Sequence, residues 1–314
     1  MAADYSTLIS EARSGDARAL ARAISTVENH APGWVELLKE LFPHTGKALT
    51  IGLTGSPGAG KSTLVDQVAK EFRKGDRSVG IIAVDPTSPY TGGAILGDRI
   101  RMQSHFADPG IYIRSMATRG SLGGLARATA DVSLVLDAAG RDVVMIETVG
   151  VGQDEVDIVR VADITVVILV PGMGDDVQSI KAGIMEIADI FVINKSDHDG
   201  AERVEKEIRA LQSLAMREDK WTPPIVKTVA TEGTGITELL GAIREYQSFM
   251  DRENLLSGRR KHNWELRLIE MLRDSLLEKA RAAMSHDDLA CYASEIAEHK
   301  RDPYSVIEEI SGKM

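Results

Sequence analysis

The chain has 314 residues, of which 43% are hydrophobic. A chain of this length and composition can bury a full core, so we expect one large globular domain with helical extensions. The 37 basic and 47 acidic side chains give a formal net charge of −10, which argues against a nucleic-acid-binding surface and against attraction to an anionic membrane. The sequence shows neither a bilayer-spanning apolar stretch nor the order of a secretory signal, so we expect a cytoplasmic location. The single cysteine, Cys291, excludes an internal disulfide framework and is expected to be a small buried side chain.

The first 46 residues predict a short helical extension. Apolar residues recur at helical spacing in three stretches, and the third of these runs into a proline that stops it. The expected helices span residues 6–12, residues 17–28 with Asp16 as N-cap, and residues 33–42. We therefore expect an N-terminal helical part over residues 1–46.

Between residues 47 and 250, short apolar runs alternate with helical patterns. The expected strands span residues 49–55, 78–85, 110–115, 142–148, 164–170, 189–194 and 224–230. Runs that are apolar at nearly every position are typical of parallel strands, because helices cover both faces of such a sheet. The sequence therefore predicts an α/β domain with a mostly parallel sheet and helices on both faces.

The strand pattern stops after about residue 250. Residues 257–285 predict one long amphipathic helix, followed by two shorter helices, the last of which begins at Asp302 and Pro303. We therefore expect residues 251–314 to form a C-terminal helical arm whose apolar face needs a partner surface.

The strongest motif is the run GSPGAGKST, which begins at Gly55, follows an apolar strand and precedes a helix. This order is the one that a P-loop requires. Backbone N–H groups and the helix N-terminus would hold phosphates, Lys61 would reach the β- and γ-phosphates, and the Ser62 hydroxyl can bind Mg²⁺. A glycine-rich turn without a ligand is the alternative. The residues expected to contact the nucleotide here are Gly55, Gly58, Ala59, Gly60, Lys61, Ser62 and Thr63.

A second motif predicts which base is bound. The run NKSD, from Asn194 to Asp197, follows an apolar strand well downstream of the phosphate loop. Guanine presents N1–H and its N2 amine side by side, so the Asp197 carboxylate can accept from both, whereas adenine would leave it partly unpaired. Asn194 can bond the base edge and fix the loop, and the stem of Lys195 can lie over the ring. Ala230, after a later strand, is the expected backbone contact to the guanine carbonyl.

Acidic residues at two further strand ends predict the metal side of the site. Asp85 ends one apolar strand and opens a loop that reaches Asp98, and Glu147 ends another strand three residues before Gly150. These three acids and the Ser62 hydroxyl are expected to hold Mg²⁺, mostly through waters. The Gly150 backbone N–H would meet a γ-phosphate. Each acid taken alone is also compatible with a helix cap or a solvated turn.

Longer stretches of the sequence resemble one family. They are GSPGAGKSTL, DPTSPYTGGAILGDRIRM, RGSLGGLA, ETVGVGQDE and PGMGDDVQSIKAGIMEIADIFVINKSD. Together they resemble the MeaB-type G-protein chaperones of methylmalonyl-CoA mutase, some relatives of which were labelled ArgK or amino-acid transport kinases. The resemblance covers nearly the whole chain, including both helical ends.

The resemblance implies a P-loop GTPase domain over residues 47–250 and hydrolysis of GTP to GDP and phosphate. It also implies that hydrolysis controls the loading of adenosylcobalamin onto methylmalonyl-CoA mutase or a related acyl-CoA mutase, and protects that enzyme. The helical arm at residues 251–314 resembles a homodimerisation arm. Composition and spacing by themselves point to neither the corrinoid nor the mutase.

Residues 171–183, between a strand and a helix, resemble a third switch loop of that family. This stretch offers Lys181 to the phosphates, and since no arginine is placed to act as a finger, intrinsic turnover is expected to be slow. Lys181 is also compatible with a solvated helix position. The residues expected to take part in catalysis are Lys61, Asp85, Glu147 and Lys181.

Three other functions fit parts of the pattern. A nickel-insertion maturation GTPase would share the fold, but it carries its metal on clustered Cys and His, whereas here Cys291 stands alone and the 7 histidines form no ligand-spaced pair. An ATP-dependent kinase of an amino-acid transport system is disfavoured by the NKSD run. A signal-recognition-type targeting GTPase needs a Met-lined groove, which the 11 scattered methionines do not indicate.

Overall fold

The structure is a computed structural model of the chain, which forms two compact units, Met1–Leu256 and Ser257–Met314. It describes residues 5–85, 108–117, 124–150, 154–172, 186–214, 217, 219–282, 284–285 and 287–312. Within these ranges, no helix combines the length and the apolar character that a bilayer crossing requires.

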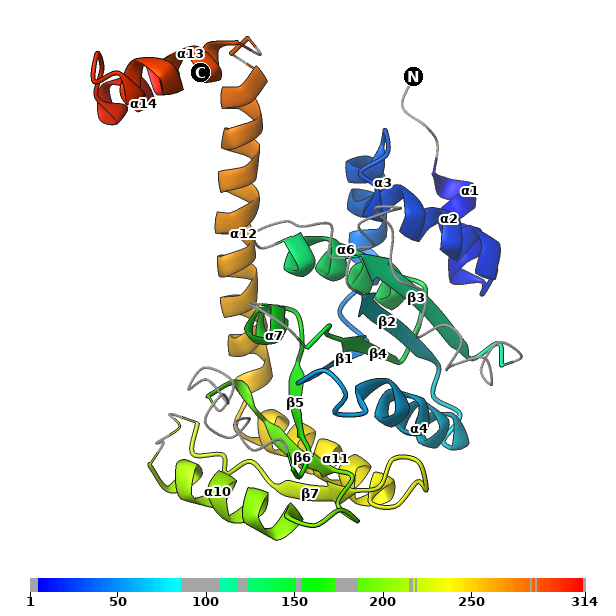
Figure 1. The fold of residues 1–314 in the computed structure, drawn as a ribbon. Coiled ribbons are helices and arrows are strands. Elements are labelled where there is room, and N and C mark those ends of the chain that lie inside the picture. The colour runs from blue at the N-terminus through cyan, green and yellow to red at the C-terminus, as the bar shows by residue number, and fades with distance from the viewer. Residues whose placement is uncertain are drawn as a thin grey trace. The chain divides into compact units, whose positions relative to one another are not determined.

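The described strands of the first unit form one seven-stranded parallel sheet in the order β3-β2-β4-β1-β5-β6-β7 (Figure 1). The strands are β1 (Leu49–Gly55), β2 (Val79–Asp85), β3 (Ile111–Ala117), β4 (Val143–Glu147), β5 (Ile164–Leu169), β6 (Ile190–Asn194) and β7 (Ile225–Thr228). β2 to β4 lie on one side of β1, and β5 to β7 lie on the other. Because open parallel sheets bind ligands where the strand order reverses, the carboxyl end of β1 is the expected binding edge.

Helices cover both faces of this sheet, which confirms the predicted α/β architecture. On β4, Met145 belongs to the core shared with α4 and α11, whereas Val144 and Ile146 belong to the core shared with α1, α2, α3 and α6. On β6, Phe191 and Ile193 pack against α10. The helical elements of this unit are α1 (Ser6–Arg13), α2 (Ala17–Glu28), α3 (Trp34–Leu41), η1 (Phe42–His44), α4 (Lys61–Lys74), α6 (Gly124–Ala138), α7 (Asp154–Asp157), η3 (Ile158–Arg160), α10 (Ala201–Leu214) and α11 (Ile236–Arg252).

The N-terminal helices pack directly on the sheet domain. The N-cap predicted for α2 is confirmed, because the Ala19 N–H donates to Asp16 Oδ1 at 2.7 Å. At the other end of α2, the Glu28 carboxylate accepts from the Arg114 guanidinium of β3, with Nε 2.8 Å from Oε2. The side chain of Glu28 is only 8% exposed, so this ion pair fixes α2 against the sheet.

Aspartates fix the amino ends of neighbouring strands. Each lies directly before a strand and accepts a hydrogen bond from the backbone N–H near the start of the adjacent strand. The pairs are Asp142–Ser78 (2.7 Å), Asp163–Thr50 (3.0 Å) and Asp189–Thr165 (2.8 Å). Because charge-assisted hydrogen bonds are stronger than neutral ones, these contacts stabilise the sheet at the edge opposite the carboxyl ends of the strands.

The second unit is helical, as predicted, although its long helix begins earlier than expected. α12 (Leu255–Ala282) is followed by α13 (Asp288–Ala297) and α14 (Pro303–Gly312). α13 and α14 are joined by a hydrogen bond of 2.8 Å from Tyr292 Oη to Glu309 Oε1. Cys291 on α13 is exposed, so the expectation that it would be buried was wrong: α13 packs too little surface to cover it. The three-part division at residues 46 and 250 stays a prediction.

Candidate functional site

The phosphate loop joins the central strand β1 to the first turn of α4. Three of its glycines have positive φ angles, and Gly60, at 86°, is the N-cap of α4. A Cβ on Gly60 would collide with the side-chain amide of Asn194, so only glycine fits there. The loop therefore presents the N-terminus of α4 to whatever binds at the carboxyl end of β1, and helix N-termini favour anions.

Lys61 lies folded into this loop, with only 6% of its surface exposed. Its Nζ donates to the backbone oxygens of Gly55 (2.8 Å), Ser56 (3.0 Å) and Val149 (3.4 Å). The ammonium group therefore forms hydrogen bonds with carbonyl groups of both the phosphate loop and the segment that follows β4. To bind phosphates, it has to exchange some of these carbonyls for phosphate oxygens.

The described residues that were predicted to hold Mg²⁺ lie at the ends of β2 and β4 and in the first turn of α4. Ser62 Oγ donates to Glu147 Oε1 at 2.7 Å, and both residues are buried. Asp85 ends β2, which pairs with β4 so that Ala83 lies opposite Glu147, and Asp85 is itself 5% exposed. The donor set is thus all oxygen, the type that Mg²⁺ prefers. No group of three or more His, Cys, Asp or Glu lies close enough to hold a metal among the described residues, and Asp98 lies outside them.

Gly150 lies against the phosphate loop. Its φ is 91°, and a Cβ there would come within 2.5 Å of both the Gly55 carbonyl oxygen and Lys61 Nζ. The segment after Glu147 therefore approaches the loop as closely as backbone allows. The other residue predicted to act on the phosphates, Lys181, lies outside the described part of the chain.

Asn194, at the end of β6, connects three segments of the site. Its Nδ2 donates to the Ala59 carbonyl at 2.8 Å, and its Oδ1 accepts from Thr228 Oγ1 at 3.0 Å and from the Ala230 N–H at 3.1 Å. The residue is 2% exposed. This side chain thus joins the phosphate loop to the loop after β7, and the contacts of Asn194 and Ala230 with a base stay predictions.

Lys195 and Asp197 lie beside this junction on the surface. Lys195 has a φ of 54° and donates from Nζ to the Gly58 carbonyl at 2.9 Å, so its stem crosses to the phosphate loop. The Asp197 side chain is 51% exposed and lies 3.8 Å from His198 Nε2. A carboxylate open to solvent at this edge is available to a ligand.

Sequence reasoning missed Thr54, Thr148 and Thr228. Thr228 lies opposite Asn194 in the parallel register of β6 and β7, and the predicted strand hid this pairing because it ran on to Ala230. Thr54 and Thr148 follow Leu53 and Glu147, which are themselves partners across β1 and β4. Their hydroxyl groups are 3.0 Å apart and buried.

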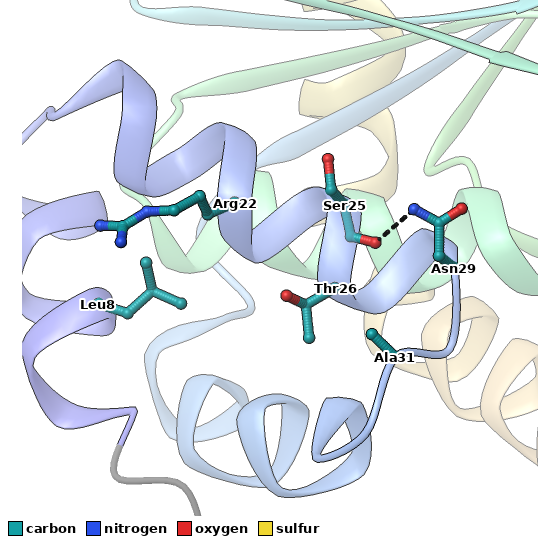
Figure 2. A pocket seen from close by; sticks show the side chains of 6 residues that line it. All are labelled: Leu8, Arg22, Ser25, Thr26, Asn29 and Ala31. Atoms are coloured by element: carbon teal, nitrogen blue, oxygen red, sulfur yellow. Dashed lines mark hydrogen bonds between the residues drawn. The ribbon is translucent and has the colours of Figure 1, made fainter.

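A separate hollow of about 410 Å³ lies on the N-terminal helices and is lined by Leu8, Arg22, Ser25, Thr26, Asn29 and Ala31 (Figure 2). Its polar groups bind to the protein itself. Asn29 Nδ2 donates to the Ser25 carbonyl at 2.8 Å, and Arg22 pairs with Glu11 at 3.1 Å. The first contact stabilises the end of α2 and the second joins α2 to α1, and none of the predicted site residues lines the hollow.

Comparisons with known proteins show the family to which the chain belongs. The family described as "Methylmalonyl Co-A mutase-associated GTPase MeaB" matches residues 20–285. A putative GTPase of Pyrococcus abyssi is 50% identical over 97% of this chain and 96% of its own length. The mouse mitochondrial protein named methylmalonic aciduria type A homolog is 36% identical over 84% of this chain and 68% of its own length. The crystal structure of a protein titled LAO/AO transport system kinase is 28% identical, has a TM-score of 0.74 and covers 98% of this chain and 96% of that one.

Proposed function

Since the chain belongs to the MeaB family of methylmalonyl-CoA mutase-associated P-loop GTPases, we propose that its GTP hydrolysis controls the loading of adenosylcobalamin onto an acyl-CoA mutase. The mutase is methylmalonyl-CoA mutase or a related enzyme, and the chain also protects it. The observation that carries this proposal is the family match over residues 20–285, which spans the phosphate loop, Glu147 and the NKSD run.

Lys61 and the phosphate loop would bind the nucleotide. The Lys61 ammonium turns from the carbonyls of Gly55, Ser56 and Val149 to the β- and γ-phosphates, where it offsets their charge. Backbone N–H groups at the start of α4 bind the same phosphates. The Val149 carbonyl then loses its lysine partner, so the segment after Glu147 responds directly to the nucleotide.

We propose that Ser62, Asp85 and Glu147 hold Mg²⁺, with Asp98 as a further acid. The Ser62 hydroxyl and the Glu147 carboxylate are already in contact, and both belong to the oxygen ligands that Mg²⁺ takes. When bound, the ion would neutralise charge on the β- and γ-phosphates. The Gly150 N–H donates to the γ-phosphate from the other side of the site.

Asp197 would select guanine. Its exposed carboxylate accepts from N1–H and the N2 amine, while Lys195 crosses beside the base to Gly58. Asn194 holds the phosphate loop and the Ala230 loop at a fixed separation, so the base and the phosphates are read by one connected surface.

We further propose that α12 binds a second copy of the chain. Leu268, Leu272 and Leu276 follow one another at four-residue spacing and are 59%, 60% and 44% exposed. Residues at this spacing share one helix face. A symmetric dimer would cover the same stripe on both copies with one self-complementary contact.

The association with a mutase is tested by GTP turnover. Purified adenosylcobalamin-dependent methylmalonyl-CoA mutase should co-purify with the chain and raise its GTP turnover by at least about tenfold, because the intrinsic turnover is predicted to be slow. A chain that hydrolyses GTP at the same rate with and without the mutase, and that does not bind it, would refute the proposed partner. A mutase-free measurement of GTP turnover is the control for a folded active site.

A further inference from the structure

Two buried threonines join the phosphate loop to the segment after β4. Thr148 Oγ1 and Thr54 Oγ1 are 3.0 Å apart, and the residues are 1% and 0% exposed. The Thr148 N–H also donates to the Leu53 carbonyl at 3.1 Å. Thr54 immediately precedes Gly55 of the phosphate loop, and Thr148 immediately follows Glu147. The pair therefore lies where the two functional segments leave the sheet.

The two hydroxyl groups are not needed to fill space. Valine has nearly the same volume as threonine and buries no polar group, and a buried hydroxyl is unfavourable unless it is hydrogen-bonded. Side chains alternate along a strand, so Glu147 faces α4 and Ser62 while Thr148 faces the opposite side of the sheet. The threonine pair thus fixes the backbone of Glu147 from the face of the sheet opposite α4.

Lys61 provides a second link between the same two segments. Its Nζ binds the Gly55 and Val149 carbonyls together, and Gly150 packs against Gly55 and Lys61. Phosphates compete for this link, since they draw the lysine away from the carbonyls. They do not compete for the threonine pair, which lies below the loop inside the sheet. With nucleotide bound, the threonine pair therefore continues to link the two segments inside the sheet.

We propose that Thr54 and Thr148 are positioning residues for GTP hydrolysis, which fix the point about which the segment from Glu147 to Gly150 moves. They touch no reacting atom. Their hydrogen bond holds the Glu147 carboxylate and the Gly150 N–H in register with the phosphate loop when Lys61 releases Val149. Loss of the pair should therefore slow the chemical step and leave nucleotide binding nearly unchanged.

The test compares Thr54→Val, Thr148→Val, the double variant and Thr148→Ser in the full chain. Single-turnover GTP hydrolysis and the affinities for GTP and GDP are measured without any partner, so failure of the mutase proposal does not affect the result. Each valine variant should reduce the hydrolysis rate about five- to tenfold, the size expected for one neutral hydrogen bond. Affinities should stay within about twofold, and Thr148→Ser should retain the parent's rate.

The double variant decides between positioning and packing. It leaves no hydroxyl unpaired, so it folds even if a single variant is unstable, and it should be as slow as either single variant because the pair is broken only once. A double variant with the parent's rate would show that the hydroxyls only satisfy each other, and would overturn the proposal. A loss of GTP and GDP affinity in parallel with the rate would do the same.

Discussion

Ser62 Oγ donates a hydrogen bond of 2.7 Å to Glu147 Oε1, which joins the first turn of α4 to the end of β4. The contact links a residue of the phosphate loop motif to an acid 85 positions later. Both residues are buried, so this hydrogen bond lies in the interior between α4 and the sheet.

Glu147→Gln tests the metal side of the site. The change keeps the shape of the side chain and removes the charge that would attract Mg²⁺, so the Mg²⁺ concentration for half-maximal GTP turnover should rise about 10- to 100-fold. A titration of turnover with Mg²⁺ measures this, with Glu202→Gln on the exposed face of α10 as control. An unchanged Mg²⁺ requirement would exclude Glu147 from the metal site.

Asp197→Asn tests the base assignment. The amide cannot accept from both guanine donors but can donate to the extra carbonyl of xanthine, so preference should move from GTP towards xanthosine triphosphate. Competition binding with the two nucleotides measures the change, and Asp199→Asn, on a neighbouring exposed residue, should keep the parent's preference. If Asp197→Asn still prefers GTP to the same degree, Asp197 does not read the base.

Asn194→Ala tests the junction of the three loops. It leaves the Ala59 carbonyl, the Thr228 hydroxyl and the Ala230 N–H without the amide that pairs them. The free energy of unfolding should therefore fall by about 3 kcal/mol, against about 1 kcal/mol for Thr228→Val, which breaks one of these bonds. Urea unfolding without nucleotide provides both values, and a loss below about 0.5 kcal/mol for Asn194→Ala would mean that the loops hold together without it.

The apolar runs of the sequence predicted all the described strands because both faces of this sheet are buried. β2, β4, β5 and β6 are buried at every position, and the runs at β1 and β6 end where the structure ends them, at Gly55 and Asn194. The motifs also marked the loops that follow β1 and β6, since local glycine and polar residues distinguish them, and the contacts of these residues with a nucleotide stay predictions.

Contacts between distant segments could not be predicted in the same way. The sequence places Asn194 and Ala59 135 positions apart, and no periodicity indicates that an amide joins them. Burial of Cys291 was expected from its residue type, but the surroundings of a side chain depend on how much surface its helix packs, and α13 packs little. The start of α12 at Leu255 was also missed: both leucines were assigned to the C-terminal arm but outside its long helix, whereas they begin that helix and pack against the core of the sheet domain.

Charged substitutions in the exposed leucine stripe of α12 should change the mass of the chain in solution. Leu268→Glu with Leu272→Glu should convert a dimer to a monomer, because charges on the covered stripe would be desolvated without partners. Light scattering after size-exclusion chromatography measures the mass, and Glu278→Lys, an exposed position of the same helix outside this stripe, should leave it unchanged. A double variant with the parent's mass would show that this stripe is not the contact between copies.

The lowered pKa of Asp142 predicts how the free energy of unfolding depends on pH. Burial opposes ionisation of its carboxylate, but hydrogen bonds from the Ser78 backbone and hydroxyl, together with Arg77, lower its pKa below the ordinary value. A lowered pKa contributes stability above the unfolded value of about 3.9, and this contribution is lost as the pH falls through the folded value. Asp142→Asn should therefore destabilise the chain at pH 7 and much less at pH 3, whereas Asp251→Asn, on an exposed residue of α11, should not. An equal effect of Asp142→Asn at both pH values would contradict this assignment.

Loading of apo-mutase with adenosylcobalamin tests the account most directly. Bound cofactor is followed by its absorbance, and mutase turnover by product formation, in the presence of the chain with GTP, with a non-hydrolysable GTP analogue, or with GTP and the Lys61→Ala variant. We predict that loading depends on hydrolysis, so the first mixture differs from the other two by at least about tenfold in rate. Equal loading in all three mixtures would contradict the claim that GTP hydrolysis by this chain controls delivery of the cofactor.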